Sequence, residues 1–326
     1  MKQKAKKAKK RRIPLPWFCV FVVLFVFLFV AVMLLSQNLL IYNTVSSVLG
    51  DRQRKLVSGD PEKYVRYEGD YDSKAEVYDA ANALNERVME EGIVLLKNED
   101  DVLPLGSDQR NVTVFGKNSV DIVLGGTGSN AGSMANARAD LAEALEQDGL
   151  FATNPVMRSY LTSGESGSGR PRLSDMGVTL SGIPTGEAPL PYSQAVRDSY
   201  KDYNDAAIVV ISRVGGEGFD LPRTMRYTGT KYDDFANADK AVPGARSGDD
   251  HYLQLDQNET DMLAEACANF DNVIVVINSA SPLELGFLDD KEHYAYGENI
   301  KAALWIGMPG ESGLTAVGRV LAGEVN

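Results

Sequence analysis

A run of 19 consecutive apolar residues, 17–35, constrains the fold of this 326-residue chain more than any other feature. A helix of that length spans about 28 Å at about 1.5 Å per residue, which matches the hydrocarbon core of a bilayer. A helix buried in the core of a soluble domain carries a polar stripe, and this run has none. We therefore expect residues 13–42 to form a single N-terminal transmembrane helix.

The charges around this run predict its orientation. Residues 1–12 contain eight Lys or Arg and no acid, and the first carboxylate of the chain is Asp51. The positive-inside rule then keeps residues 1–12 in the cytoplasm as a basic tail and exports the remainder as an extracellular body on the cell membrane. A cleaved signal peptide is the alternative, but its apolar region is about 7–15 residues long and ends in a small-x-small site. Residues 36–40 (SQNLL) offer no such site, so we favour an uncleaved signal anchor.

The remaining charges exclude nucleic acid as a partner. The chain has 33 basic and 45 acidic residues, so removing the eight basic residues of the tail leaves 25 against 45, a balance of −20. Nucleic-acid binding requires clustered positive charge. An extracellular body this acidic predicts a different class of ligand.

Cysteine and histidine usage argues against a metal site. The body contains a single cysteine, Cys267, and the chain has two histidines, His251 and His293. That inventory permits neither a disulfide within the body nor a Cys/His zinc pattern. Cys267 lies in a helical pattern, where we expect a buried, inert thiol. We expect no metal and no cofactor.

Residues 43–72 read as a charged stalk without sustained periodicity, and residues 73–326 as one compact domain. Short apolar runs of strand length alternate there with amphipathic helical patterns, which predicts an α/β fold: a mainly parallel sheet sandwiched by helices. We interpret residues 151–191, rich in Gly, Ser and Pro, as a surface excursion. The expected strands are 93–96, 112–115, 122–124, 206–211, 273–277 and 302–306, and the expected helices are 73–91, 134–147, 192–203, 256–270 and 312–321. Asp256, with Glu259 three residues later, predicts a capping box at the start of the helix 256–270.

In such sheets ligands bind at the carboxyl ends of the strands, so the loops after residues 124, 211 and 277 are candidate sites. Residues 125–133 (GGTGSNAGS) form a glycine-rich loop before a helix, a spacing that can cradle a pyrophosphate on backbone amides. The predicted orientation separates this loop from cytoplasmic nucleotides. A loop that holds a neutral ligand, or that turns the chain, is the favoured interpretation.

The loop after the most apolar strand carries a candidate proton donor. Residues 212–220 (SRVGGEGFD) place Glu217 between glycines, which suits a mobile general acid, although a solvated loop charge is the alternative. Asp220 and Arg223 can form an ion pair that shapes the loop. The chain contains no G-x-S-x-G, H-E-x-x-H or Walker motif, and with two histidines it argues against a Ser-His-Asp hydrolase.

A set of linked motifs resembles glycoside hydrolase family 3, the β-glucosidases, β-xylosidases and N-acetylglucosaminidases. The resemblance covers residues 73–326 and concerns the α/β sandwich domain of that family. The motifs follow in family order and spacing: 91–98 (EGIVLLKN) with 103–105 (LPL), 114–116 (VFG), 125–129 (GGTGS), 208–220 and 305–313 (WIGMPGESG).

The resemblance implies a retaining double displacement in which Glu217 is the general acid/base, about 5 Å from a nucleophilic carboxylate. It also implies contacts to the sugar from the two loops, and the substrate is a β-linked oligosaccharide or glycoside. The residues expected to make those contacts are Gly126, Thr127, Gly128, Ser129, Arg213 and Asp220.

The family's nucleophile is an aspartate on a TIM barrel of about 250 residues, which this sequence does not contain. An anchor directly before the sandwich domain resembles the reversed-order subgroup, in which a fibronectin-like module and then the barrel follow. We therefore expect the chain to be the front part of a longer β-glycosidase and inactive alone. A non-catalytic surface module that binds carbohydrate or a partner protein is the alternative, and a nucleotide-binding domain is the third hypothesis.

Overall fold

The computed structural model describes residues 15–36, 69–127, 139–171, 182–217, 221–227, 240–289 and 299–325. The chain divides into two compact units, residues 1–69 and 70–326. In the first unit, the helix α1 (Leu15–Ser36) confirms the expected long apolar helix. Its segment Pro16–Leu34 is long and apolar enough to cross a membrane, a property that a signal sequence near the N-terminus shares.

The second unit is built on a six-stranded sheet in the order β1-β6-β5-β4-β2-β3. Every neighbouring pair is parallel except β1 and β6, which are antiparallel. The predicted α/β fold with a mainly parallel sheet is thus confirmed, with β1 added as an antiparallel edge. The strands are β1 (Val94–Asn98), β2 (Asn111–Phe115), β3 (Ala152–Thr153), β4 (Ala206–Arg213), β5 (Val273–Ser279) and β6 (Ile300–Trp305).

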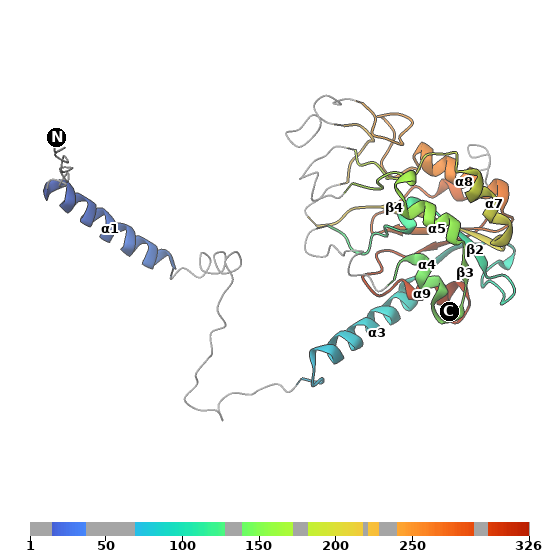
Figure 1. The fold of residues 1–326 in the computed structure, drawn as a ribbon, viewed down its shortest axis with the longest axis horizontal. Coiled ribbons are helices and arrows are strands. Elements are labelled where there is room, and N and C mark those ends of the chain that lie inside the picture. The colour runs from blue at the N-terminus through green and yellow to red at the C-terminus, as the bar shows by residue number, and fades with distance from the viewer. Residues whose placement is uncertain are drawn as a thin grey trace, which may run out of the picture. The chain divides into compact units, whose positions relative to one another are not determined.

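Helices cover both faces of this sheet (Figure 1). The α-helices of this unit are α3 (Lys74–Gly92), α4 (Leu141–Glu146), α5 (Pro155–Thr162), α7 (Gln194–Ser199), α8 (Gln257–Asn269) and α9 (Thr315–Leu321). Short 3-10 turns are η2 (Glu99–Asp101), η3 (Lys117–Ser119), η5 (Gln147–Gly149), η6 (Gly164–Ser166), η7 (Tyr200–Asp202) and η9 (Gly286–Leu288).

The two cores follow from the period of two along each strand. In β4, Ile208 and Val210 pack into a core with α4 and α9, whereas Val209 and Ile211 pack into the opposite core with α5, α7 and α8. All eight residues of β4 are buried, as a central strand covered on both faces requires. This burial holds the end of β4 in a fixed position.

The prediction of a strand at 122–124 is wrong. These residues are buried but irregular. Both edges of β2 are already occupied, by β3 and β4. The backbone of Val123 instead pairs with a side chain, accepting from and donating to the amide of Asn278. The carbonyl of Leu124 accepts from the amide of Gly310.

The interpretation of 151–191 as an excursion without regular structure is also wrong for its first part. That part contains β3 and α5. Asn154 caps α5 by accepting from the backbone of Val156 and Met157, and Pro155 occupies the first turn. Of the helix expected at 134–147, the described part begins at Leu141, where Asp140 and Glu143 form a capping box. Residues 128–138 lie outside the described residues.

Candidate active site

Two loops meet at the carboxyl ends of β2 and β4 and hold Glu217. Glu217 lies in the turn after β4 and is exposed. Its backbone carbonyl accepts a hydrogen bond of 2.6 Å from the Thr127 hydroxyl, which comes from the loop that follows β2. Thr127 and Glu217, two of the residues expected at the site, are therefore in direct contact.

Glycines make this meeting of loops possible. A Cβ atom on Gly216 would lie 2.5 Å from the backbone nitrogen of Thr127, and one on Gly126 would lie 3.0 Å from the carbonyl oxygen of Gly215. Real side chains do not tolerate the first of these distances. The backbones of the two loops thus touch directly, and Gly126 and Gly216 permit this close approach.

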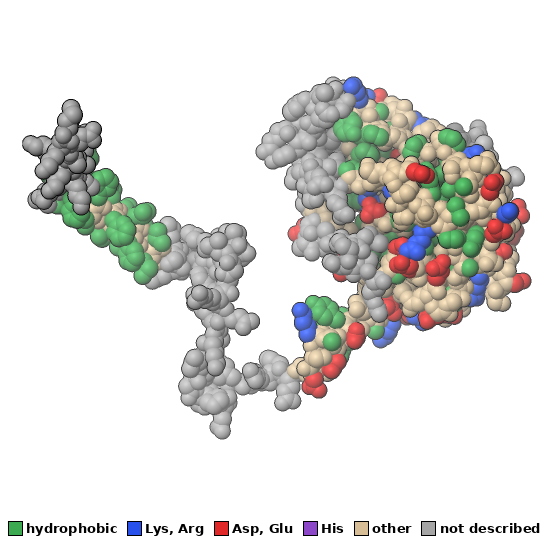
Figure 2. All heavy atoms as spheres, viewed as in Figure 1, with side chains coloured by type: hydrophobic (Ala, Val, Ile, Leu, Met, Phe, Trp, Pro, Cys, Tyr) green, Lys and Arg blue, Asp and Glu red, His purple; other side chains and the backbone are tan. Residues whose placement is uncertain are grey.

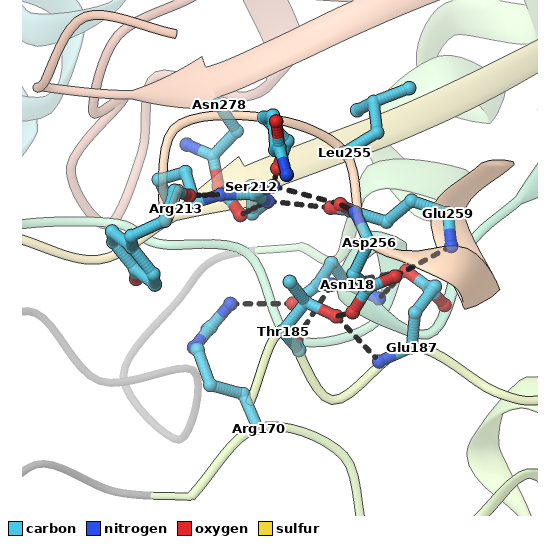
Figure 3. A network of polar contacts seen from close by, with 12 residues as sticks. Asn118, Arg170, Thr185, Glu187, Ser212, Arg213, Leu255, Asp256, Glu259 and Asn278 are labelled. Atoms are coloured by element: carbon cyan, nitrogen blue, oxygen red, sulfur yellow. Dashed lines mark hydrogen bonds and ion pairs between the residues drawn. The ribbon is translucent and has the colours of Figure 1, made fainter. Parts of the chain in front are cut away.

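Asn278, at the end of β5, ties the surrounding loops together. Its Oδ1 accepts from the Val123 amide at 2.7 Å and from the Ser212 hydroxyl at 3.0 Å. Its Nδ2 donates to the carbonyls of Val123 and Gly307 at 2.9 and 2.8 Å. One buried amide therefore joins β4 to the segments that follow β2 and β6, with its donors and both lone pairs in use. Figure 3 shows Asn278 beside Ser212 and Arg213.

Arg213 is a correction to the expected sugar contacts, because its side chain is fully buried. It forms an ion pair with Glu259 through Nη1 and Nη2 at 2.5 and 2.8 Å. Its other donors reach the carbonyls of Tyr252, Ser212 and Gln254. The five N–H groups of the guanidinium are thus all used within the protein, and none remains for a sugar.

Glu187 forms a second buried polar group beneath the loop that follows β2 (Figure 3). Its carboxylate accepts from the backbone amide of Lys117 and, at 3.0 Å, from the side-chain amide of Asn118. Burial raises the pKa of Glu187 to about 7 despite these hydrogen bonds. Arg170 in turn donates to Asn118 at 2.6 Å.

Asp256 shares this environment at the start of α8. It forms the predicted capping box with Glu259 and accepts at 2.6 Å from the Thr185 hydroxyl. Burial, and then the negative charge of Glu259, raises the pKa of Asp256 to about 7. Glu187 and Asp256 are both shielded from solvent, so they do not face a ligand.

The remaining predictions concern three sugar-binding residues, the absence of a metal site and the thiol of Cys267. Gly128, Ser129 and Asp220 lie outside the described residues. Among the described residues no three His, Cys, Asp or Glu side chains gather as metal ligands. Cys267 is buried, and burial raises its pKa to about 12, which confirms the expectation of an inert thiol.

Sequence reasoning missed Asn278 and the ion pair of Arg213 with Glu259. The only local signal for Asn278 was its position, as a polar residue directly after the apolar run of β5. Its hydrogen-bond partners lie as far as 155 residues away in the chain, so its role in joining these segments could not be predicted from the sequence. Glu259 was recognised as a capping residue, whereas its second role depends on tertiary packing.

Comparison with known proteins places this arrangement in a family. The chain is 31% identical over 242 residues to a β-glucosidase A of Butyrivibrio fibrisolvens, and the match covers 72% of this chain and 26% of that protein. It is 28% identical over 239 residues to a β-glucosidase of Ruminococcus albus, covering 72% and 21%. The chain therefore spans about a quarter of the length of these relatives.

Solved structures share the fold. Those of β-glucosidase 3B from Thermotoga neapolitana, one in complex with glycerol and one with glucose, superpose with TM-scores of 0.51 and 0.50 at 21% and 22% identity. They cover 78% and 77% of this chain and 30% of theirs. Residues 93–326 match the glycosyl hydrolase family 3 C-terminal domain. The chain belongs to glycosyl hydrolase family 3, of which it carries the C-terminal α/β domain.

Proposed function

We propose that this chain is the membrane-anchored part of an extracellular β-glycosidase that hydrolyses O-glycosyl bonds with retention of configuration. In this proposal Glu217 is the general acid/base. The nucleophilic carboxylate comes from a TIM barrel that is not among these 326 residues. The substrate is a β-linked glucoside or oligosaccharide, the ligand class suggested by the names of the related β-glucosidases.

The position of Glu217 carries the proposal. An exposed carboxylate stands at the carboxyl end of the central strand β4, on a backbone fixed by Thr127 and by the close contact of glycines. A general acid needs a fixed backbone and an accessible carboxyl group that can reach the leaving oxygen. Glu217 is the described residue that combines both in this loop.

The two steps of a retaining mechanism give Glu217 two roles. In the first step it protonates the glycosidic oxygen as the bond to the anomeric carbon breaks and the nucleophile attacks. In the second step it removes a proton from the water that displaces the nucleophile. Retaining enzymes hold their two carboxyl groups about 5 Å apart, so the barrel would present its aspartate across from the 125–127 and 214–217 loops.

The helix α1 is proposed to be the anchor. Residues 13–42 would span the membrane, with the basic tail 1–12 in the cytoplasm and the α/β domain outside the cell. The exposed apolar side chains along α1 and the eight positive charges before it support this orientation.

A leaving-group series tests the acid role in the complete polypeptide that contains this chain. We expect Glu217→Ala to lower kcat/KM for cellobiose, whose glucose leaving group is poor, by about 10²- to 10⁴-fold, because the departing oxygen then lacks its proton donor. The kcat/KM for a dinitrophenyl β-glucoside reports only the steps up to departure of a leaving group that needs no proton, so it should fall far less. Glu165→Gln, at another exposed glutamate, is the control and should leave both rates unchanged. Equal losses on the two substrates would contradict the acid role.

The alternative is a binding module that acts without catalysis. Titration of the complete polypeptide with cellobiose separates the two functions. Binding without any hydrolysis, in wild type and in Glu217→Ala alike, would favour the module.

A further inference from the structure

The exposed hydrophobic side chains of the α/β unit are concentrated in one place. Among its described residues, every large hydrophobic side chain that is exposed, except Val156, lies between residues 71 and 96. Figure 2 shows such side chains gathered on the N-terminal part of α3. Residues scattered singly on a surface need no explanation, but a contiguous apolar patch marks an interaction site.

Along α3 these side chains form one stripe, which we call the α3 stripe: Val77, Ala81, Leu84 and Val88. Their spacing of four, three and four residues is the a/d pattern of a coiled coil. Val77, Leu84 and Val88 are 47%, 58% and 58% exposed, although a stripe with this spacing normally faces a partner helix.

The α/β domain itself does not cover the stripe, because α3 attaches by another side. Met89 is buried, Asn85 donates to the Pro309 carbonyl at 3.0 Å, and Glu90 pairs with Arg319. At 3.6 residues per turn, these attachments lie between about a fifth and three fifths of a turn round the helix from the α3 stripe. The helix thus presents one side to its own domain and leaves a second apolar side open.

The sequence of α3 is complementary to itself when two copies run antiparallel. In an antiparallel coiled coil each a position faces a d position of the other helix. Val77 then meets Val88, and the small Ala81 meets the large Leu84. At both ends Lys74 meets Glu91, so opposite charges face each other twice by symmetry. A parallel pair would instead place Lys74 against Lys74 and Glu91 against Glu91.

We propose that the α3 stripe is a homodimer interface, in which α3 of one chain packs antiparallel against α3 of a second copy through a twofold axis between Ala81 and Leu84. Two short helices bury little area, so the dimer is weak, with a dissociation constant of about micromolar size. This inference does not depend on the proposed glycosidase activity.

Sedimentation of the full chain in detergent, from about 1 to 100 µM, tests the interface. We expect wild type to dimerise, and Leu84→Asp to weaken the dimer at least about a hundredfold, because two buried leucines are lost per dimer. Leu84 is more than half exposed in the single chain, so its domain should melt at an unchanged temperature. Asp79→Lys, on the opposite side of α3, is the matched control and should dimerise like wild type.

A charge exchange tests the pairing. Lys74→Glu and Glu91→Lys should each weaken the dimer by about three- to tenfold, since each replaces two attractions with two repulsions. The double variant should return to the wild-type constant. A double variant as weak as the single ones, or a wild-type chain that stays monomeric at about 100 µM, overturns the proposal. So does a Leu84→Asp chain that dimerises as well as wild type.

Cysteine cross-linking tests the orientation in a Cys19→Ser background. Ala81→Cys and Leu84→Cys chains, mixed and oxidised, should form disulfide-linked heterodimers, whereas either variant alone should not. Cross-linking of each variant with itself would indicate parallel helices and contradict the proposal.

Discussion

Glu187 and Asp256 hold their protons to a higher pH than the same side chains do in water. Both are buried carboxyl groups, and their hydrogen bonds do not offset the cost of burying a charge, so each pKa lies at about 7. Such groups bind protons in the folded state at a pH where the unfolded chain has released them. The stability of the domain is therefore linked to their protonation.

We predict that the free energy of unfolding of the domain falls as pH rises from 5 to 8. The stabilisation by these groups is complete below the unfolded pKa values near 4 and is lost as pH passes the folded values near 7. The two groups together contribute on the order of a few kcal/mol. Urea unfolding at several pH values measures this slope, and Glu187→Gln should flatten it because one of the two groups is removed. Glu165→Gln, an exposed glutamate, should keep the wild-type slope.

An unchanged slope in Glu187→Gln would show that other groups cause the pH dependence. The same measurement on Asp256→Asn reports the second group, although that variant also weakens the cap of α8 by about 1 kcal/mol at every pH. The cap effect shifts the whole curve, whereas the titration changes its slope.

At the scale of elements, the site depends on how the ends of the strands are joined. The loops after β2 and β4 touch through glycines, and Asn278 at the end of β5 binds the backbone of the segments that flank them. The strands supply rigidity, and the loops supply an accessible carboxylate. A small change in one loop should therefore displace Glu217 without unfolding the sheet.

Gly216→Ala tests this coupling. The new methyl group would lie 2.5 Å from the backbone nitrogen of Thr127, so the two loops must separate. We expect turnover of the complete enzyme to fall by about 10²-fold, since a displacement of about 1 Å can have that effect, with little change in melting temperature. Gly164→Ala, where no atom lies within 4 Å of the added carbon, is the matched control. A Gly216→Ala enzyme with wild-type turnover would contradict the role of this contact.

Local signals in the sequence predicted some elements correctly and missed others. The β-branched runs of β4 and β5 and the Asp256–Glu259 capping box each carry their signal within a few residues. The helix α5 was missed because the Gly and Ser content of residues 151–191 favoured an irregular surface segment. The cap of α5, Asn154 before Pro155, lies within that segment.

The errors at the site came from contacts between distant segments. Arg213 was expected to face a sugar because the family resemblance implies that its loop contacts the substrate, yet Glu259, 46 residues further along, holds it inside the protein. Residues 122–124 have the composition of a strand, but the pairing positions beside β2 are taken. Neither outcome can be predicted from the local sequence, because both depend on which segments become neighbours in the folded chain.

At the scale of the whole molecule, the chain combines an apolar helix with an acidic α/β domain of a family that acts on glycosides. An uncleaved anchor predicts that the protein remains in the membrane fraction after extraction with alkaline carbonate. Mass spectrometry should then find the intact N-terminal tail 1–12. Protease added outside the cell should degrade the α/β domain and spare that tail.

Replacing Leu24 and Phe27 by arginine should release the protein from the membrane, because each charge at the centre of a span costs about 3 kcal/mol. Replacing Lys2 and Lys4 by glutamine is the control, since six positive charges remain in the tail. A mature protein that begins after residue 36 would contradict the anchor and indicate a cleaved signal peptide.

Azide distinguishes an acid/base role of Glu217 from a purely structural one. In the complete enzyme carrying Glu217→Ala, a dinitrophenyl β-glucoside should still form the covalent intermediate, because its leaving group needs no proton. Water then lacks its general base, whereas azide needs none. We expect azide to accelerate turnover and to yield the β-configured glycosyl azide, because Glu217 acts as acid/base in a retaining mechanism. A rate indifferent to azide, or a product of inverted configuration, would contradict it.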